Sequence, residues 1–174
     1  VLIQHIQYHK SQSNNQANNN CTLLFLLFFA KWYIDVMSRM GVTTVEGKSG
    51  YGLDKETEIK QLKVMKAINE DPMRKVDIAT TFLGAHAVPT EYKGREDEYI
   101  DFLIKEMLPL IQEKGLAEHC DIFCEKGVFT VEQSRRLLQA AKDKGFGVKI
   151  HADEIVSFGG AELAGELQAL SADH

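Results

Sequence analysis

Residues 119–154 read HCDIFCEKGVFTVEQSRRLLQAAKDKGFGVKIHADE, and this stretch predicts a strand, a helix and a second strand in succession. Residues 119–124 and 148–152 have the length and apolar composition of buried strands. Between them, Thr130 is suited to cap an amphipathic helix, and Gly145 stands where a helix C-terminus is expected. Two strands joined through a helix pair in parallel by a right-handed crossover. The stretch therefore predicts an α/β protein.

The same alternation extends in both directions from this unit. Strands are expected at residues 42–46 and 76–82, and a fifth begins at Ser171. Helices are expected after the capping residue Asp54, at residues 96–114 with a kink or early stop at Pro109, and at residues 160–170. This order fits two architectures, an open doubly wound sheet and a piece of an eight-stranded barrel. Periodicity alone does not choose between them.

The composition is ordinary for one globular domain of 174 residues, with 44% hydrophobic and 26% charged residues. A net charge of −5 without a basic stripe argues against a nucleic-acid partner. No GxGxxG follows an expected strand, and EGKSGYG at residues 46–52 lacks the P-loop spacing, so no nucleotide site is indicated.

Cys120 and Cys124 would lie about 13 Å apart in a strand, at roughly 3.3 Å per residue, which is too far for a disulfide. Reduced cysteines favour a cytoplasmic protein.

Residues 1–36 differ from the rest and are expected to form a poorly ordered leader outside the catalytic domain at residues 37–174. SQSNNQANNN at residues 11–20 is a polar low-complexity tract. CTLLFLLFFA at residues 21–30 is too short to span a bilayer, which needs roughly 20 residues, and lacks the preceding basic region of a signal peptide. A membrane or export role is the alternative. His5 and His9 have the spacing of a helical metal pair, but no acidic residue lies between them.

Polar residues follow the carboxyl end of each expected strand. In chain order these residues are Glu46, Lys48, Ser49 and Tyr51, then His86, then Glu125, then His151, Asp153 and Glu154, and finally Asp173 and His174. A single histidine beside a strand is more often a satisfied polar group than a ligand. In a parallel barrel, however, all these ends meet on the face where the βα loops build the active site. We therefore expect the residues to surround one cavity.

The residue types suit a metal ion. Imidazole and carboxylate groups hold zinc or iron(II), which lowers the pKa of a bound water to near 7. His151 lies in the apolar run VKIHAD at residues 148–153, where a buried ring needs partners for both nitrogens. A metal on one nitrogen and an acceptor on the other would supply them. Glu154 is placed to accept a proton from the bound water or from a substrate ring N–H.

Five segments carrying these residues resemble the imidazolonepropionases, a family of metal-dependent hydrolases in the amidohydrolase superfamily. The segments are TTVEGKSGYGLD (residues 43–54), TTFLGAHAVPTEYKGREDEYID (80–101), DIFCEKGVFTVEQSRRLL (121–138), KIHADE (149–154) and GGAELAGELQALSADH (159–174). The likeness is collinear from about Met37 to the last residue. It implies the central portion of a TIM-type (β/α)8 barrel, with about four βα units and the start of a fifth strand. It also implies the opening of the ring of 4-imidazolone-5-propanoate to N-formimidoyl-L-glutamate in histidine catabolism, with one zinc or iron(II) ion per complete site.

The resemblance implies roles for individual residues. His151 resembles the metal-ligand histidine after the fifth barrel strand, and Glu154 resembles the glutamate that contacts the imidazolone ring and moves the proton. Tyr51 and His86 resemble substrate-binding groups. His174 resembles the histidine after the sixth strand, which polarises the carbonyl or stabilises the developing oxyanion. Three further residues are expected to contact these side chains without touching the substrate or the metal: Lys48, Glu125 and Asp153.

The sequence departs from the family pattern in three ways. No HxH metal pair precedes Met37, and the arginine that grips the substrate carboxylate is not found there. The metal-binding aspartate of the eighth strand would lie beyond His174. Because His151 is the one family ligand present, we expect a truncated chain that binds metal weakly and has little or no activity alone.

Two other functions stay open. One is another cyclic amidase or deaminase of the same superfamily. The other is a non-catalytic half-barrel that associates with another chain, since an incomplete barrel exposes sheet edges and apolar surface. The expected partner is a small-molecule substrate, without nucleic acid or membrane, and a homodimer is left open for a full-length protein.

Overall fold

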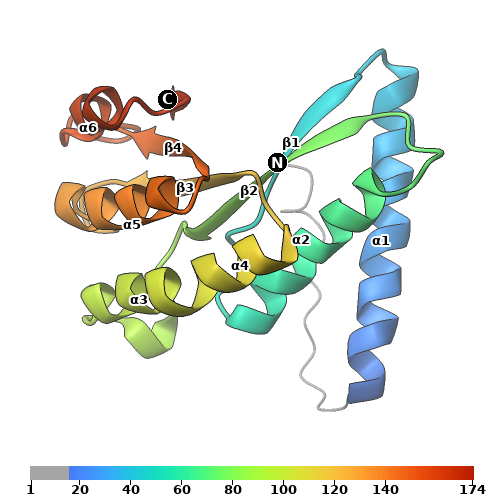
Figure 1. Ribbon diagram of the computed structural model, residues 1–174, viewed down its shortest axis with the longest axis horizontal. Coiled ribbons are helices and arrows are strands. Elements are labelled where there is room, and N and C mark those ends of the chain that lie inside the picture. The colour runs from blue at the N-terminus through green and yellow to red at the C-terminus, as the bar shows by residue number, and fades with distance from the viewer. Residues whose placement is uncertain (1–15) are drawn as a thin grey trace.

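The computed structural model describes residues 16–174, with side chains from residue 23 onward. His5 and His9 lie outside the described residues. The elements run in the order α1 (Gln16–Arg39), β1 (Thr44–Lys48), α2 (Lys55–Asn69), β2 (Asp77–Ala85), η2 (Thr90–Tyr92), α3 (Glu96–Phe102), η3 (Leu103–Met107), α4 (Leu108–Lys114), β3 (His119–Cys124), α5 (Val131–Asp143), β4 (Gly147–Ala152), α6 (Gly160–Leu167) and β5 (Ser171–Asp173). Figure 1 shows these elements along the chain.

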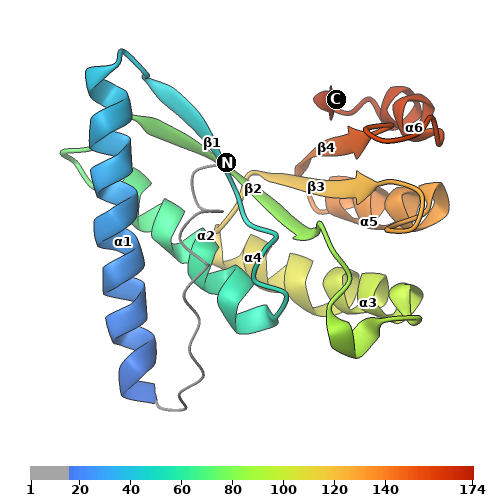
Figure 2. The ribbon, with the colours of Figure 1, turned by 180° about the vertical axis from the view of Figure 1, so that it is seen from behind.

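The five strands form one parallel sheet in the order β1-β2-β3-β4-β5. Each strand pairs with the next one along the chain, and the connecting helices lie outside the curve of the sheet (Figures 1 and 2). The result is a curled half-barrel, which is compatible with part of a TIM-type barrel. The prediction of an α/β protein with parallel strands is confirmed.

The caps expected from the sequence set the helix starts. Asp54 accepts a hydrogen bond from the backbone N–H of Thr57 at 2.7 Å and begins α2. Thr130 and Gln133 form a reciprocal capping box at the start of α5. Gly145 has a φ of +88°, which favours glycine, just beyond the C-terminus of α5. The helix expected at residues 160–170 is shorter, because Gln168 takes a left-handed conformation and ends α6.

The helical region expected at residues 96–114 is interrupted before Pro109. A π-helical segment, η3, separates α3 from α4, and the backbone N–H of Leu108 donates to the carbonyl of Leu103. Proline cannot donate a backbone hydrogen bond, and its ring crowds the preceding turn. The wider π turn accommodates the proline. Pro109 then lies in the first turn of α4, where no backbone N–H is needed. The helical run does not stop early at Pro109 but continues to Lys114, and a π-helical segment precedes the proline where a kink or an early stop was predicted.

The apolar core lies between the sheet and the helices. Cys120, Ile122 and Cys124 of β3 are fully buried there, and both cysteines are free thiols. The sheet and helix approach closely at Gly47, where an added Cβ would lie 2.3 Å from the Met65 sulfur of α2. Since alternate residues of a strand point to opposite faces, the intervening residues of each strand face the open side of the sheet.

The structure differs from the sequence expectation at α1. Residues 16–39, most of which were expected to lie in a poorly ordered leader, form one helix. Ala30 and Ile34 on this helix are buried in the same core as α2. In the part of the chain that the structure describes, no helix has the length and apolar character needed to cross a membrane.

Candidate active site

The open face of the sheet is lined with charged side chains that contact one another across strands. Lys48 of β1 lies 2.8 Å from Asp121 of β3 and 2.7 Å from Asp173 of β5, measured from the Lys48 Nζ to a carboxylate oxygen of each. Asp121 is fully buried, and only 19% of the Lys48 side chain is exposed. Burial disfavours the lysine charge, but the carboxylates of Asp121, Asp173 and Glu46 together outweigh this effect, so the pKa of Lys48 is raised. Lys48 therefore remains an ammonium ion that links three strands.

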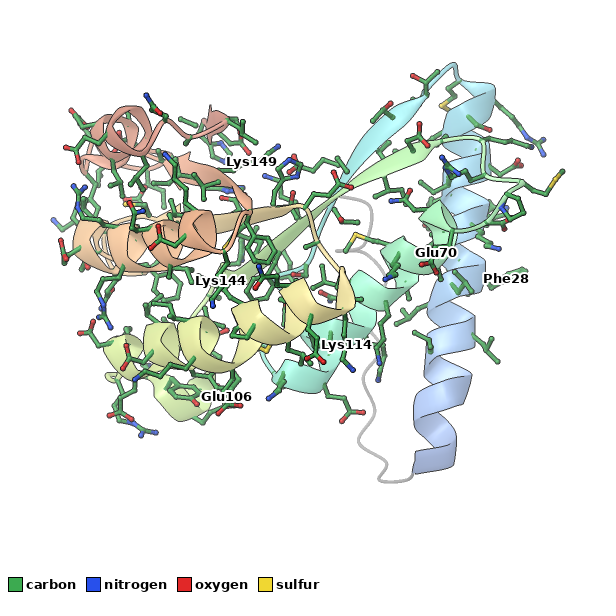
Figure 3. All side chains as sticks on the ribbon, in the orientation of Figure 1. Phe28, Glu70, Glu106, Lys114, Lys144 and Lys149 are labelled. Atoms are coloured by element: carbon green, nitrogen blue, oxygen red, sulfur yellow. The ribbon has the colours of Figure 1, made fainter. Side chains whose placement is uncertain are left out.

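A second charged group lies on the same face. Lys149 of β4 lies on the open side of the sheet (Figure 3). Its Nζ is 2.9 Å from the Oε1 of Glu46 in β1. Thr81 of β2 donates a hydrogen bond to the same Glu46 oxygen at 2.5 Å. Burial raises the pKa of Glu46, but the bonds from Thr81 and Lys149 outweigh it, so this pKa is lowered overall. The carboxylate is thus held ionised.

His151 is held by Asp121. Its Nδ1 lies 3.0 Å from one Asp121 oxygen and 3.1 Å from the other. Asp121 also accepts the backbone N–H of Ile122 at 2.7 Å. An ionised carboxylate can only accept hydrogen bonds, so this contact favours the tautomer of His151 with a proton on Nδ1. The Nε2 then carries no proton and offers its lone pair to another partner.

Aromatic rings form a continuous row at the carboxyl ends of the strands. The centroid of His86 lies 4.4 Å from that of Tyr51, 5.7 Å from that of Phe123 and 6.4 Å from that of His151. The rings of His151 and His174 are 5.4 Å apart. The Tyr51 hydroxyl lies 3.3 Å from the His86 Nε2. Burial and the neighbouring His151 lower the pKa of His86, so its ring is favoured in the neutral form.

The loop that carries Tyr51 is tied to α2. Glu58, a buried residue of this helix, accepts the backbone N–H of Gly50 at 3.1 Å and that of Gly52 at 2.6 Å. A Cβ at Gly50 would lie 2.5 Å from the Leu83 carbonyl oxygen, and the φ of Gly50 is +122°. Glycine is therefore required at Gly50, and Glu58 sets the course of the chain on both sides of Tyr51.

The loop that carries Glu154 is held by two carboxylates. Asp153 accepts backbone N–H bonds from four residues, with the shortest, from Phe158, at 2.6 Å. Glu125 accepts the backbone N–H of Ile155 at 2.9 Å. These hydrogen bonds lower the pKa of both carboxyl groups. The carboxylate of Glu154 lies 3.6 Å from the Nε2 of His174.

The structure brings together the residues that the sequence singled out. Tyr51, His86 and His151 belong to the ring row, and His174 joins it to Glu154. Sequence reasoning missed two contributors. Asp121 was not identified as the partner of His151, and Glu58 was not identified as the support of the Tyr51 loop. Asp121 could have been noticed as a charged residue inside an apolar strand, whereas Glu58 gives no such signal.

Comparisons with known proteins agree on one family. The chain is 79% identical to the imidazolonepropionase of Phocaeicola vulgatus over 145 residues, which are 83% of this chain and 35% of that protein. It is 67% identical to that of Bacteroides thetaiotaomicron over 162 residues, 93% of this chain and 39% of that protein. It is 60% identical to that of Clostridium tetani over 145 residues, 83% of this chain and 34% of that protein. The chain is a homologue of the imidazolonepropionases. It spans about a third of their length, and no protein-family model matches it.

The likeness to imidazolonepropionases raises the question of which residues here suit a metal ion. Single ligand atoms of Asp121, His151 and Asp173 all lie within 4.8 Å of one another. Imidazole and carboxylate donors suit zinc or iron. Both carboxylates, however, already bind the Lys48 ammonium. His151 fits a metal ligand better, because Asp121 holds one ring nitrogen and leaves the other available.

Proposed function

We propose that this chain contributes the central part of the active site of an imidazolonepropionase. The observation that carries the proposal is the contact row formed by Tyr51, His86, His151 and His174, with Glu154 beside His174, at the carboxyl ends of four strands. In parallel barrels this is the face where active sites lie. The identity to imidazolonepropionases agrees with this substrate class.

The proposed reaction opens the ring of 4-imidazolone-5-propanoate with one water. The water oxygen bonds to the ring carbonyl carbon, the bond from that carbon to the ring nitrogen breaks, and a proton from the water ends on that nitrogen. The product is N-formimidoyl-L-glutamate. A zinc or iron(II) ion, when bound, would supply Lewis acidity and lower the pKa of the attacking water.

Tyr51, His86, His151, Glu154 and His174 each have a role in this proposal. Glu154 accepts the proton of the attacking water and returns it to the leaving nitrogen. His174 stabilises the negative charge that develops on the carbonyl oxygen. Tyr51 and His86 bind the planar substrate ring, for which their adjacent aromatic faces are suited. His151 would hold the metal ion through its Nε2.

The proposal extends to domain organisation and location. Residues 37–174 form the barrel portion, and α1, most of which precedes it, shares the core of α2 through Ala30 and Ile34. The buried free thiols of Cys120 and Cys124 agree with a reducing compartment such as the cytoplasm.

A chimera tests the proposed function. Residues 37–174 would replace the matching segment of the Phocaeicola vulgatus relative, and product formation from 4-imidazolone-5-propanoate would be followed by mass spectrometry. We expect turnover close to that of the parent. Glu154→Gln in the chimera should lower kcat about 100-fold or more, whereas Glu162→Gln on the exposed side of α6 should leave it unchanged. A folded, metal-loaded chimera that hydrolyses a cyclic amide without the propanoate chain, but not this substrate, would refute the assignment.

A further inference from the structure

The Lys48 ammonium occupies the position of a cation between two carboxylates. Its Nζ lies 2.8 Å from Asp121 and 2.7 Å from Asp173. The same two carboxylates and His151 form the group of close metal-ligating atoms on the open face of the sheet. A lysine charge therefore lies among donors that would otherwise attract a metal ion.

The hydrogen bonds of Asp121 leave it little capacity to bind anything else. One oxygen accepts from Lys48, the other accepts from the backbone N–H of Ile122, and both lie close to the Nδ1 of His151. The Asp121 side chain is fully buried. A buried carboxylate needs such compensation, because an unpaired charge away from water is costly. Lys48 thus fixes the position of the Asp121 carboxylate that contacts His151.

The second lysine of this face serves a different carboxylate. Lys149 lies 2.9 Å from Glu46. Lys48 lies 3.6 Å from Glu46, farther than from either aspartate. The two lysines carry equal charge and have similarly low exposure, so they form a matched pair for an experiment.

We propose that Lys48 is a positioning residue that acts as a built-in cation for Asp121 and Asp173. It keeps a metal ion out of this carboxylate pair and fixes Asp121, which in turn orients His151. The consequence for metal binding through the His151 Nε2 rests on the proposed function. A cation site on the Asp121, His151 and Asp173 atoms would open only when the Lys48 side chain is replaced by one without an ammonium group.

Zinc binding to the 174-residue chain tests this inference. Lys48→Met removes the ammonium while keeping an apolar stem of similar length. Equilibrium dialysis should show zinc bound at least about tenfold more tightly by Lys48→Met than by the wild-type chain, since two carboxylates lose their compensating charge. Lys149→Met removes the same charge from the same face and should leave the affinity unchanged. Adding Asp173→Asn to Lys48→Met should abolish the gain.

Equal zinc affinities of the Lys48→Met and Lys149→Met chains would overturn the inference. That result would leave the proposed function untouched, because the chimera tests it separately. Conversely, Lys48→Met could bind zinc more tightly while the chimera stays active after His151→Ala. The inference would then stand, and His151 would not be a metal ligand.

A measurement on the wild-type chain covers the case in which Lys48→Met fails to fold. In a sample with ¹⁵N-labelled lysine, the Lys48 ammonium should give an exchange-protected NMR signal, assigned by its loss in Lys48→Arg. We expect this signal to persist when one equivalent of zinc is added. If the signal were absent before zinc is added, or disappeared after it, Lys48 would not exclude a metal ion from Asp121 and Asp173.

Discussion

At the scale of single residues, Glu58 determines the course of the loop that carries Tyr51. Its Oε1 accepts the backbone N–H groups of Gly50 and Gly52. In Glu58→Ala both donors lose their partner, which should lower the free energy of unfolding by about 1–3 kcal/mol. The Tyr51 ring should also leave the His86 ring, now 4.4 Å away. Urea denaturation and the Tyr51–His86 nuclear Overhauser effect measure the two outcomes.

The exposed Lys63 on the same helix provides the control. Lys63→Ala should leave both the stability and the Tyr51–His86 contact unchanged. If Glu58→Ala matched this control, the loop would be held by other contacts.

The ionisation of Glu58 gives a pH prediction. Burial raises the pKa of its carboxyl above the usual 4.5, so the folded state favours the protonated form. The resulting stabilisation is present below pH 4.5 and is lost as pH rises through the raised pKa. Glu58→Gln cannot ionise, so its stability relative to the wild type should increase as pH rises from 4.5. Thermal unfolding of both chains across this range provides the measurement, and parallel pH curves would contradict the prediction.

Residue-level prediction from sequence succeeded where position along the chain was sufficient. Tyr51, His86 and His151 each stand at or just after the carboxyl end of a strand, and that position alone predicted that they would meet. Glu58 could not be found this way. It lies at one of many polar positions of α2, and its contact with the loop depends on how the helix crosses beneath it.

At the scale of elements, caps and apolar runs predicted most of the boundaries. The third strand was predicted with its observed bounds, and the fourth begins one residue earlier than expected. β1 was placed two residues too early because the β-branched run at residues 42–44 resembles a strand. α1 was not predicted because composition alone does not show that a partner helix is available to order it.

Two glycines give contrasting predictions for element packing. Gly47→Val places a side chain where a Cβ would already lie 2.3 Å from the Met65 sulfur and 2.8 Å from Ile78. The contact between β1 and α2 should open, at a cost of about 1–3 kcal/mol. Gly165 in α6 has no atom within 4 Å of an added Cβ, so Gly165→Ala should stabilise the helix by about 0.5–1 kcal/mol. Chemical denaturation of the two variants should therefore shift in opposite directions.

The loop between β4 and α6 gives another element-scale prediction. Asp153 accepts the N–H groups at residues 158–161, which include the first turn of α6. Asp153→Ala should destabilise the chain by about 1 kcal/mol, as for the loss of a helix cap. Amide hydrogen exchange should accelerate across residues 154–161. Glu162→Ala, which alters the same helix without touching these bonds, should leave exchange unchanged, and equal exchange in both variants would remove Asp153 from this role.

At the scale of the whole molecule, the choice between an open sheet and a half-barrel depended on one face of the strands. A doubly wound sheet is covered by helices on both faces, so its strands are apolar throughout. Here Glu46, Lys48, Asp121 and Lys149 alternate with apolar or small residues. A face with this charge cannot be buried under a helix. The alternation of charged and apolar residues was visible in the sequence. It did not decide between the two folds, because the pairing of these charges across strands is seen only in the structure.

The outer surface of α1 gives the final prediction. Phe28 is 67% exposed and points away from the rest of the molecule (Figure 3), whereas Ile34 on the same helix is 5% exposed in the core. Phe28→Lys removes exposed apolar surface, so it should raise solubility and reduce the binding of a hydrophobic dye without changing stability. Ile34→Lys places a charge in the core and should lower the free energy of unfolding by about 3 kcal/mol or more. Dye fluorescence and urea denaturation of both variants provide the measurements. If Phe28→Lys destabilised the chain as much as Ile34→Lys, α1 would pack through the face that the structure leaves exposed.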